Sequence, residues 1–206
     1  MEYVAAVEII VPGLAEPLRW ALPPAGVTVA DAGTVTVEAG PRTDVFVDPQ
    51  TSDVTANAPR ALAPAPAGDF QLSARVKVGF RSTFDAGVLL VWFDERHSAK
   101  LCFELSPQGV PTVVSVITKD VSDDANGWPI SGDEVWLRIS RIGATWALHA
   151  GVDGNTWALA RYFGLDSDLP AQVGILAQSP AGEGCTVRFD QLSVVEHRLA
   201  GLRDGS

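Results

Sequence analysis

The chain alternates short apolar runs with turn residues at intervals of about ten residues, and this rhythm limits the fold more than any other feature. Glycine, proline and aspartate separate runs rich in valine, isoleucine, leucine and aromatic residues, and no window repeats its apolar residues at the helical period. Many short antiparallel strands leave a two-layer sandwich or a closed barrel as the alternatives. The spacing predicts strands near residues 26–30, 34–38, 44–48, 69–78, 86–93, 99–105, 111–118, 134–141, 145–151, 156–163, 172–179 and 186–196.

The length of 206 residues suits one large β domain, which we expect to span residues 1–196. Hydrophobic residues make up 47% of the chain and charged residues 19%, as in a globular protein. Residues 57–69, rich in alanine and proline, are interpreted as a partly extended surface connection, because too few strands precede them for a separate domain. Residues 197–206 are expected to form a flexible C-terminal tail.

The charge of the chain argues against two classes of partner. Fifteen basic residues stand against 25 acidic ones, which gives a net charge of −10 without any basic cluster. Such a protein repels phosphate backbones and anionic lipids, so neither nucleic acid nor a membrane is an expected partner. Glu2 and Glu8 lie where a secretory signal would carry lysine or arginine, which favours a cytoplasmic location.

The strand predicted at residues 99–105 separates its side chains by character, because successive residues of a strand point to opposite faces. One face is apolar, with Leu101, Phe103 and Leu105, and the other carries Lys100, Cys102 and Glu104. The polar face is either solvated or a site. The two cysteines of the chain, Cys102 and Cys185, are too few for a disulfide framework or a zinc knuckle.

Several short motifs resemble, in their order, a bacterial and fungal family of unknown function whose fungal member is described as a regulator of enolase. The motifs are TDVF (43–46), DFQLSARV (69–76), FDAGVLL (84–90), the strand from Lys100 to Glu104, SVIT with SDD (115–118 and 122–124), VWLRISR (135–141), VDGNTW (152–157) and VGILAQSP (173–180). The resemblance implies an all-β, concanavalin A-like jelly roll, the two-sheet antiparallel sandwich shared by legume lectins and several glucanases, with a concave face that often holds ligand.

The same resemblance points to particular side chains on that face. The family pattern is matched by Asp85, Lys100, Glu104, Ser115, Thr118, Ser122 and Asp123. The chain departs from it where Ser98 replaces the usual tryptophan and Cys102 the usual glycine, which argues against a close-fitting pocket at that point. Tryptophan can stack on sugar rings, and Trp136 and Arg138 share one face of the 134–141 strand. The predicted ligand-binding residues are Asp85, Trp92, Lys100, Glu104, Trp136 and Arg138.

Catalysis has weaker support from the sequence. Retaining glucanases of this fold place carboxylates at alternate positions of one strand, and no Glu-x-Asp strand is present here. Lys100 lies four residues before Glu104, which favours the charged form of Glu104 over a raised pKa. Glu104 with Asp85 is the carboxylate pair that a glycoside-active enzyme would use.

One segment has the spacing of a calcium loop. Ser122, Asp124 and Asn126 alternate before Gly127, and Asp133 occupies the twelfth position. The loop has few carboxylates and lacks the final bidentate glutamate, so a polar turn is the preferred interpretation and no metal or cofactor is predicted.

Three functions remain open on these grounds. The first is a non-catalytic, lectin-like protein that binds a saccharide or small polar ligand on its concave face. The second is an interaction module that binds a metabolic enzyme, the role suggested by the fungal relative. The third is a glycoside-active hydrolase with an unusual carboxylate pair.

Overall fold

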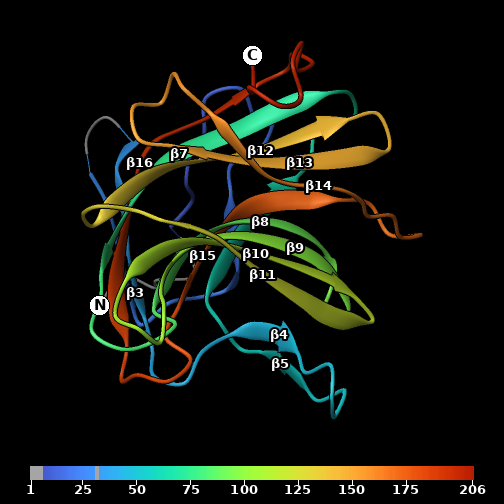
Figure 1. The fold of residues 1–206 in the computed structure, drawn as a ribbon. Helices are drawn as coiled ribbons and strands as arrows, with labels where there is room; N and C mark the ends of the chain where they lie inside the picture. Colours follow the sequence, from blue (N-terminus) through green and yellow to red (C-terminus); the bar gives the residue numbers. More distant parts are fainter. Residues whose placement is uncertain (1–6, 31–32) are drawn as a thin grey trace.

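The computed structural model describes residues 7–30 and 33–206, and consists of two antiparallel sheets packed face to face (Figure 1). The start of the predicted domain, with Glu2, lies outside these residues. The first sheet has the order β1 (Arg19–Leu22), β6 (Arg60–Pro64), β15 (Gln172–Gln178), β8 (Ala86–Asp94), β9 (His97–Leu105), β10 (Pro111–Lys119) and β11 (Val121–Pro129). The second has the order β14 (Ala158–Gly164), β13 (Thr145–Gly151), β12 (Glu134–Ile142), β7 (Phe70–Gly79), β16 (Cys185–Val195), β3 (Val35–Ala39) and β2 (Gly26–Val29). A short hairpin joins β4 (Val45–Val47) to β5 (Val54–Ala56).

These sheets confirm the all-β sandwich and exclude the closed barrel, because each sheet ends in unpaired edge strands. Each strand predicted from the sequence lies within or overlaps an observed strand. No helix in the described part of the chain is long and apolar enough to cross a membrane.

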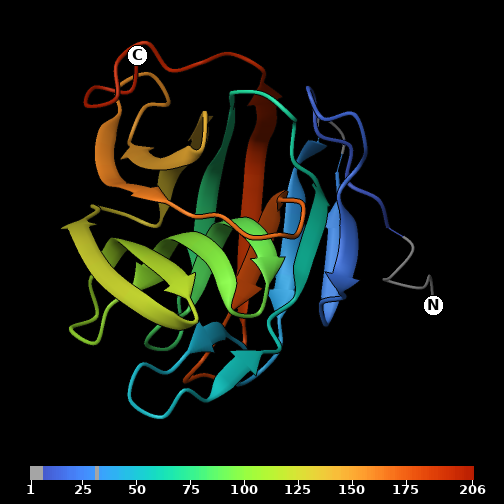
Figure 2. The same ribbon diagram turned by 90° about the vertical axis from the view of Figure 1, so that its right-hand side faces the viewer.

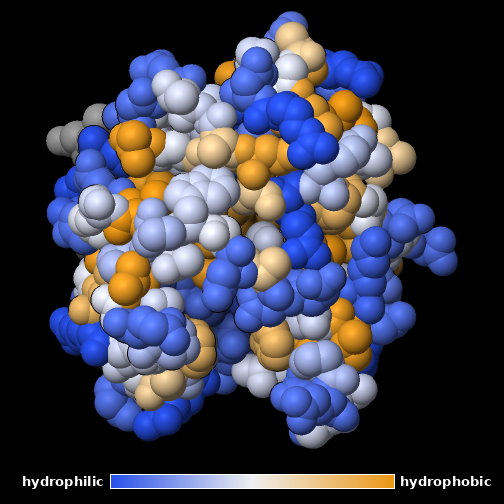
Figure 3. Space-filling model, viewed as in Figure 1, coloured by the Kyte–Doolittle hydropathy of each residue, from blue (hydrophilic) through white to orange (hydrophobic). Residues whose placement is uncertain are grey.

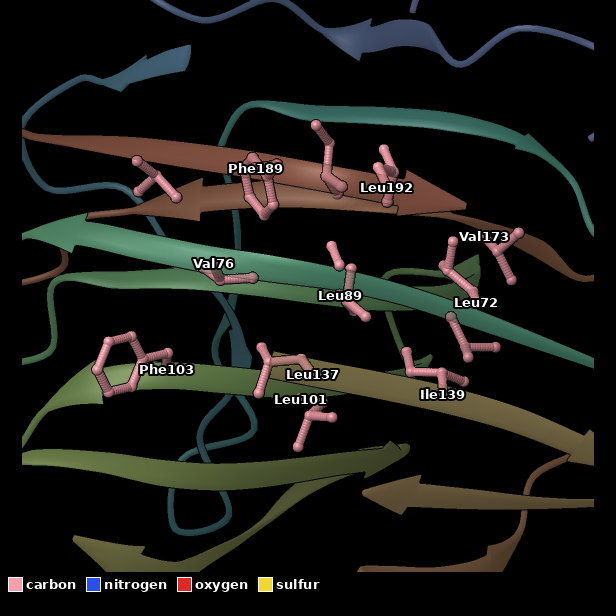
Figure 4. Close-up of a cluster of buried hydrophobic side chains, with 14 of the residues drawn as sticks. Leu72, Val76, Leu89, Leu101, Phe103, Leu137, Ile139, Val173, Phe189 and Leu192 are labelled. Atoms are coloured by element: carbon pink, nitrogen blue, oxygen red, sulfur yellow. The ribbon is translucent and has the colours of Figure 1, made fainter. Parts of the chain in front are cut away.

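The main core lies between the two sheets and is made by the period-two pattern of the strands. In β7 every second residue is buried, from Phe70 to Val78, while the residues between them are half-buried. Leu101 and Phe103 of β9 point into this core, as predicted, whereas Leu105 is only half-buried. Figure 4 shows Leu101 and Phe103 between the sheets, with Leu89, Leu137 and Phe189.

Two strands replace segments for which the sequence predicted other structure. The predicted surface connection at 57–69 contains β6, whose three alanine and leucine residues are buried between β1 and β15. The neighbouring strand β15 has glycine at position 174 because a side chain there would collide with the backbone of Ala61. The segment interpreted as a polar turn contains β11, an edge strand that pairs with β10.

The β4–β5 hairpin packs on the outward, concave face of the first sheet. A second apolar cluster lies between them, with Val45 and Phe46 from the hairpin against Val88, Leu90 and Val116 of the sheet. Figures 1 and 2 show the strands β8 to β11 curving above the hairpin. Figure 3 shows a hollow in the surface beside it, bordered largely by hydrophilic residues.

Residues 199–206, which we call the C-terminal strap, lie against the outward face of the second sheet (Figure 1). The side chain of Leu199 is buried, and the carbonyl oxygens of Leu202 and Gly205 accept hydrogen bonds from β13 and β12. The sequence predicted a flexible tail here and did not predict these contacts.

Candidate functional site

A small pocket lies between the concave face of the first sheet and the hairpin, and it contains the polar face of β9. Its volume is about 230 Å³. The lining residues come from five strands and two loops: Asp44, Phe46, Phe84, Lys100, Glu104, Val116, Asp124 and Gln178. Lys100 and Glu104 are therefore brought together as the alternation of β9 predicted. We call this the concave pocket.

Lys100 is buried at the base of the concave pocket, with 2% of its surface exposed. Its ammonium donates hydrogen bonds to Asp44 Oδ1 at 2.9 Å and to Gln178 Oε1 at 3.0 Å. Burial lowers the pKa of Lys100, but the carboxylate of Asp44 and other negative groups nearby more than compensate, so the pKa is raised. Lys100 is therefore a buried, charged group whose charge is paired with Asp44, and not a solvated one.

Glu104 corrects the prediction that Lys100 would keep it charged. Burial raises the pKa of Glu104 to about 8, and the attraction of Lys100 only partly offsets that effect. Burial also raises the pKa of Asp124, with Lys100 acting in the opposite direction and Asp44 in the same direction. At neutral pH the Glu104 carboxyl is mostly protonated and can donate as well as accept a hydrogen bond.

Two aromatic side chains border these polar groups. Phe46 is half-buried on β4, and Phe84 is 39% exposed in the turn before β8. Phe84 has a φ of 69°, a left-handed conformation that is unusual for a bulky residue and is found mostly where the surroundings fix it. An aromatic ring beside hydrogen-bonding groups is the arrangement that can stack on a sugar and orient its hydroxyls.

Asp85, in the turn before β8, and Trp92, on β8, do not line the concave pocket. Asp85 is fully buried, and its carboxylate accepts the backbone N–H groups of Arg81 and Ser82 at 2.9 Å and the hydroxyl of Ser179. These bonds fix the turn that precedes β8. Trp92 is buried near the other end of β8, where the guanidinium of Arg60 lies 4.4 Å from the centre of its ring.

Trp136 and Arg138 lie on the other sheet, so the expected common face of all six predicted residues is not formed. Both belong to β12 and point to the outward face of the second sheet. Trp136 packs beneath Gly154, and Arg138 lies 4.1 Å from the centre of the Trp157 ring. The sequence placed these residues on one face of their strand correctly, but could not show which sheet that strand joins.

The candidate calcium segment is mostly extended, because residues 121–129 form β11. The hydroxyl of Ser122 accepts the backbone N–H of Val47 at 2.9 Å and shares a hydrogen bond with Thr118. Among the residues that the structure describes, no group of three or more histidine, cysteine, aspartate or glutamate side chains is arranged to hold a metal ion. Asp124 instead lines the concave pocket.

Sequence reasoning missed five of the lining residues: Asp44, Phe46, Phe84, Val116 and Gln178. The sequence did contain a signal for Asp44, because a buried lysine needs a carboxylate partner and Asp44 lies in the TDVF motif. Cys102, which replaces the usual glycine, does not fill the concave pocket. Its thiol is buried in the second apolar cluster, and burial raises its pKa well above the usual value.

Comparison with known proteins agrees with this architecture. The chain is 26% identical over 175 residues to "Regulation of enolase protein 1" of Saccharomyces cerevisiae, a match that covers 84% of this chain and 87% of that protein. The crystal structure of a functionally unknown protein from Saccharomyces cerevisiae superposes with a TM-score of 0.78 at 23% identity, covering 87% of this chain and 96% of the other.

A glycoside hydrolase structure is also similar in fold. A xylan beta-1,4-xylosidase from Bacillus halodurans superposes with a TM-score of 0.69 at 13% identity, and the match covers 86% of this chain but 36% of that one. At this identity the likeness shows the fold alone, a concanavalin A-like jelly roll. The family model described as "Protein of unknown function (DUF1349)" matches residues 20–197, and the chain belongs to this family.

Proposed function

We propose that the protein is a non-catalytic, lectin-like module that binds a neutral saccharide in the concave pocket. The observation that supports this most directly is the combination of Phe84, an exposed aromatic side chain, with Glu104, Asp124 and Gln178 around one small pocket. Sugar sites use such groups, because carboxyl and amide oxygens accept from hydroxyls while a ring stacks on the apolar face of the pyranose.

The charges of the concave pocket favour a neutral ligand. Lys100 is already paired with Asp44, and the remaining ionisable groups, Glu104 and Asp124, are acids. An anionic sugar would meet carboxyl groups and no uncommitted cation, and the repulsion would add to the cost of removing its own charge from water. Uronic acids and sugar phosphates are therefore expected to bind more weakly than neutral sugars.

The size of the concave pocket favours a single sugar unit. Its volume of about 230 Å³ is below the range of about 300–1,000 Å³ that is usual for sites of drug-sized ligands. A longer saccharide would leave the pocket along the exposed rim near Phe84 and Asp124.

Hydrolysis is the less favoured use of the same residues. A raised pKa suits Glu104 to act as an acid, but its expected partner Asp85 is buried and hydrogen-bonded within its own turn. A retaining mechanism needs a second carboxyl group about 5 Å away across the bond that is cut. The family to which the chain belongs is itself described only as one of unknown function.

The test uses Phe84→Ala with Tyr162→Ala as the matched control, because Tyr162 is a half-exposed aromatic residue on the other sheet. Thermal unfolding of each protein is followed with neutral monosaccharides and with the corresponding uronic acids, since a ligand that binds the native state raises its stability. A neutral sugar should stabilise the wild type and the control, and Phe84→Ala should lose the effect. Equal shifts in all three proteins, or no shift at all, would refute binding at this pocket.

A second candidate function rests on the yeast relative, whose name refers to regulation of enolase. On this reading the protein is a regulatory module that binds a metabolic enzyme in the cytoplasm, the location expected from the sequence. Incubating the purified protein with purified enolase and analysing the mixture by size-exclusion chromatography tests it. Co-elution would favour this function, and separate elution at micromolar concentrations of both proteins would count against it.

A further inference from the structure

A second polar cluster lies far from the concave pocket, on the outward face of the second sheet. Arg138 and His149 are directly opposite each other on β12 and β13, and Ser140 follows Arg138 on the same face. Their exposed fractions are 6%, 0% and 0%, because the segment after β16 folds over them. Outward-facing residues of a two-layer sandwich are normally solvated, so this burial needs an explanation.

Each of the three side chains has a buried polar atom without a hydrogen-bond partner. These atoms are Arg138 Nε, Ser140 Oγ and His149 Nδ1. Buried polar groups are nearly always paired, and each unpaired one costs free energy. Two of these atoms, Arg138 Nε and Ser140 Oγ, can donate, whereas His149 Nδ1 is an acceptor because Nε2 carries the proton. The Nε atoms of Arg75 and Arg188 on this sheet are unpaired as well, but both of those guanidiniums have a carboxylate partner. The two donors on neighbouring outward positions of β12 therefore lack an acceptor among the described residues.

The charge of Arg138 is also uncompensated. Arg75 and Arg188, on neighbouring strands of the same sheet, both pair with Asp190. Arg138 forms no ion pair with any residue in the described ranges, although it is more deeply buried than either. A buried cation is normally paired with a carboxylate or another anion. The guanidinium lies over the Trp157 ring, which fixes its plane and leaves its edge free to donate.

Backbone carbonyls of the strap accept the hydrogen bonds that the cluster does make. Arg138 donates to the carbonyl of Gly205, and His149 Nε2 donates to the carbonyl of Leu202 at 2.8 Å. These are the hydrogen bonds that join the strap to the cluster, and neutral carbonyls compensate a cation less well than an anion does.

The remaining backbone bonds of the strap are internal. Ala200 and Gly201 donate to a terminal carboxylate oxygen of Ser206, and Gly205 donates to the carbonyl of Gly201. Leu199 contributes its one well-buried apolar side chain. The strap is thus joined to the sheet by two hydrogen bonds and by the packing of Leu199 and Gly205, without any backbone pairing to a strand.

We propose that Arg138, Ser140 and His149 form a binding site for an oxyanion, a carboxylate or phosphate group on a small molecule, which the C-terminal strap covers in this structure. Arg138 would bind two oxygens through its Nε and terminal N–H groups, while the Ser140 hydroxyl donates to the same group. The anion would displace the carbonyls of Leu202 and Gly205. This site is independent of the concave pocket, which lies on the other sheet.

A glycine in the strap provides the test. Gly205 has a φ of +69°, and a side chain there would collide with the Arg138 guanidinium and with Trp157. Gly205→Val should therefore lift the strap from the sheet. Gly109→Val is the matched control, because Gly109 has a φ of +73° but nothing within 4 Å of the added carbon. Both variants carry the same backbone strain, and only one opens the cluster.

Inorganic phosphate and acetate are the probes, titrated calorimetrically at constant ionic strength. We expect Gly205→Val to bind one of them at least tenfold more tightly than the wild type or Gly109→Val, and Gly205→Val with Arg138→Gln to lose that gain. A response to phosphate alone assigns a phosphate group, and a response to acetate alone assigns a carboxylate. Equal affinities in all proteins would overturn the proposal.

A second measurement keeps the test decisive if Gly205→Val does not fold. In the wild-type protein, saturating anion should accelerate hydrogen exchange at the amides of Gly201 and Gly205, which are hydrogen-bonded within the strap. Exchange elsewhere in the second sheet should not change. Unchanged exchange in the strap at saturating concentrations of both probes would refute displacement by an oxyanion.

Discussion

Replacing Asp44 by asparagine removes the charge that compensates Lys100 and leaves the shape of the pair unchanged. Lys100 is 3% exposed at its side chain and Asp44 is 21% exposed, with 2.9 Å between the nitrogen and the oxygen. Removing one partner of a buried ion pair costs about 3–5 kcal/mol, because the other charge stays buried without compensation. The amide oxygen of asparagine can still accept a hydrogen bond, so we expect the lower end, about 3 kcal/mol.

Urea unfolding followed by tryptophan fluorescence measures this loss. For a chain of this size about 3 kcal/mol corresponds to a fall in Tm of roughly 6–12 °C. Adding Lys100→Met to Asp44→Asn removes the buried charge itself, and should restore about 2 kcal/mol relative to the single variant.

The matched control is Glu183→Gln, which breaks the pair between Arg42 and Glu183. Those side chains are 67% and 83% exposed, so the loss should stay below about 1 kcal/mol. A loss of that size for Asp44→Asn, or a double variant less stable than Asp44→Asn alone, would show that Lys100 is solvated and that the burial argument is wrong.

Three further predictions test other parts of the structure. The pKa of Glu104 is raised from 4.5 to about 8, so between these values the folded state holds a proton that the unfolded state releases, and the free energy of unfolding should fall by about 1.4 kcal/mol per pH unit. Urea unfolding at pH 5, 7 and 9 should show this fall in the wild type and not in Glu104→Gln. Parallel pH profiles of the two proteins would contradict the raised pKa. Gly87→Ala should destabilise the protein by about 1–3 kcal/mol in urea unfolding, because the added methyl group would collide with Val76 and Val187. Gly68→Ala should be nearly neutral, because its methyl group would meet nothing within 4 Å. Equal effects of the two substitutions would refute the packing argument. Cys102 and Cys185 are buried, and burial raises the pKa of both thiols, so a thiol reagent should modify neither in the native protein and both in urea, and fast labelling of native protein would disprove their burial.

The fold was largely predictable because alternating apolar and polar residues, bounded by turn residues, indicate the strands of a sheet. In β7 the alternation of buried and half-buried residues is continuous over almost the whole strand. Gly154 supplies the φ of +75° that the turn between β13 and β14 requires. The strands that were missed lack this signal. β6 is rich in alanine and lies beside prolines, and β11 is an edge strand with polar residues on both faces.

For the candidate site, the sequence could predict only which residues of a single strand share a face. The alternation of β9 places Lys100 and Glu104 on one face, but the register between distant strands is a property of the whole sheet. Asp44 lies 56 residues before Lys100 and reaches it through the hairpin. For the same reason Trp136 and Arg138 could be placed on one face of a strand, while their separation from Lys100 by the thickness of the sandwich could not be foreseen.

Lys100 and Arg138, the buried lysine and arginine of the described residues, differ in their partners, and this difference underlies the ligand that we propose for each. Lys100 has a carboxylate from the hairpin as its partner, and is surrounded by further acids, so the concave pocket has no charge left to attract an anion. Arg138 has only a backbone carbonyl and an aromatic ring. In a chain with a net charge of −10, a neighbouring carboxylate would have been the simplest way to neutralise it. A buried guanidinium left without one therefore favours an anion that arrives from outside, whereas the paired lysine favours a ligand without charge.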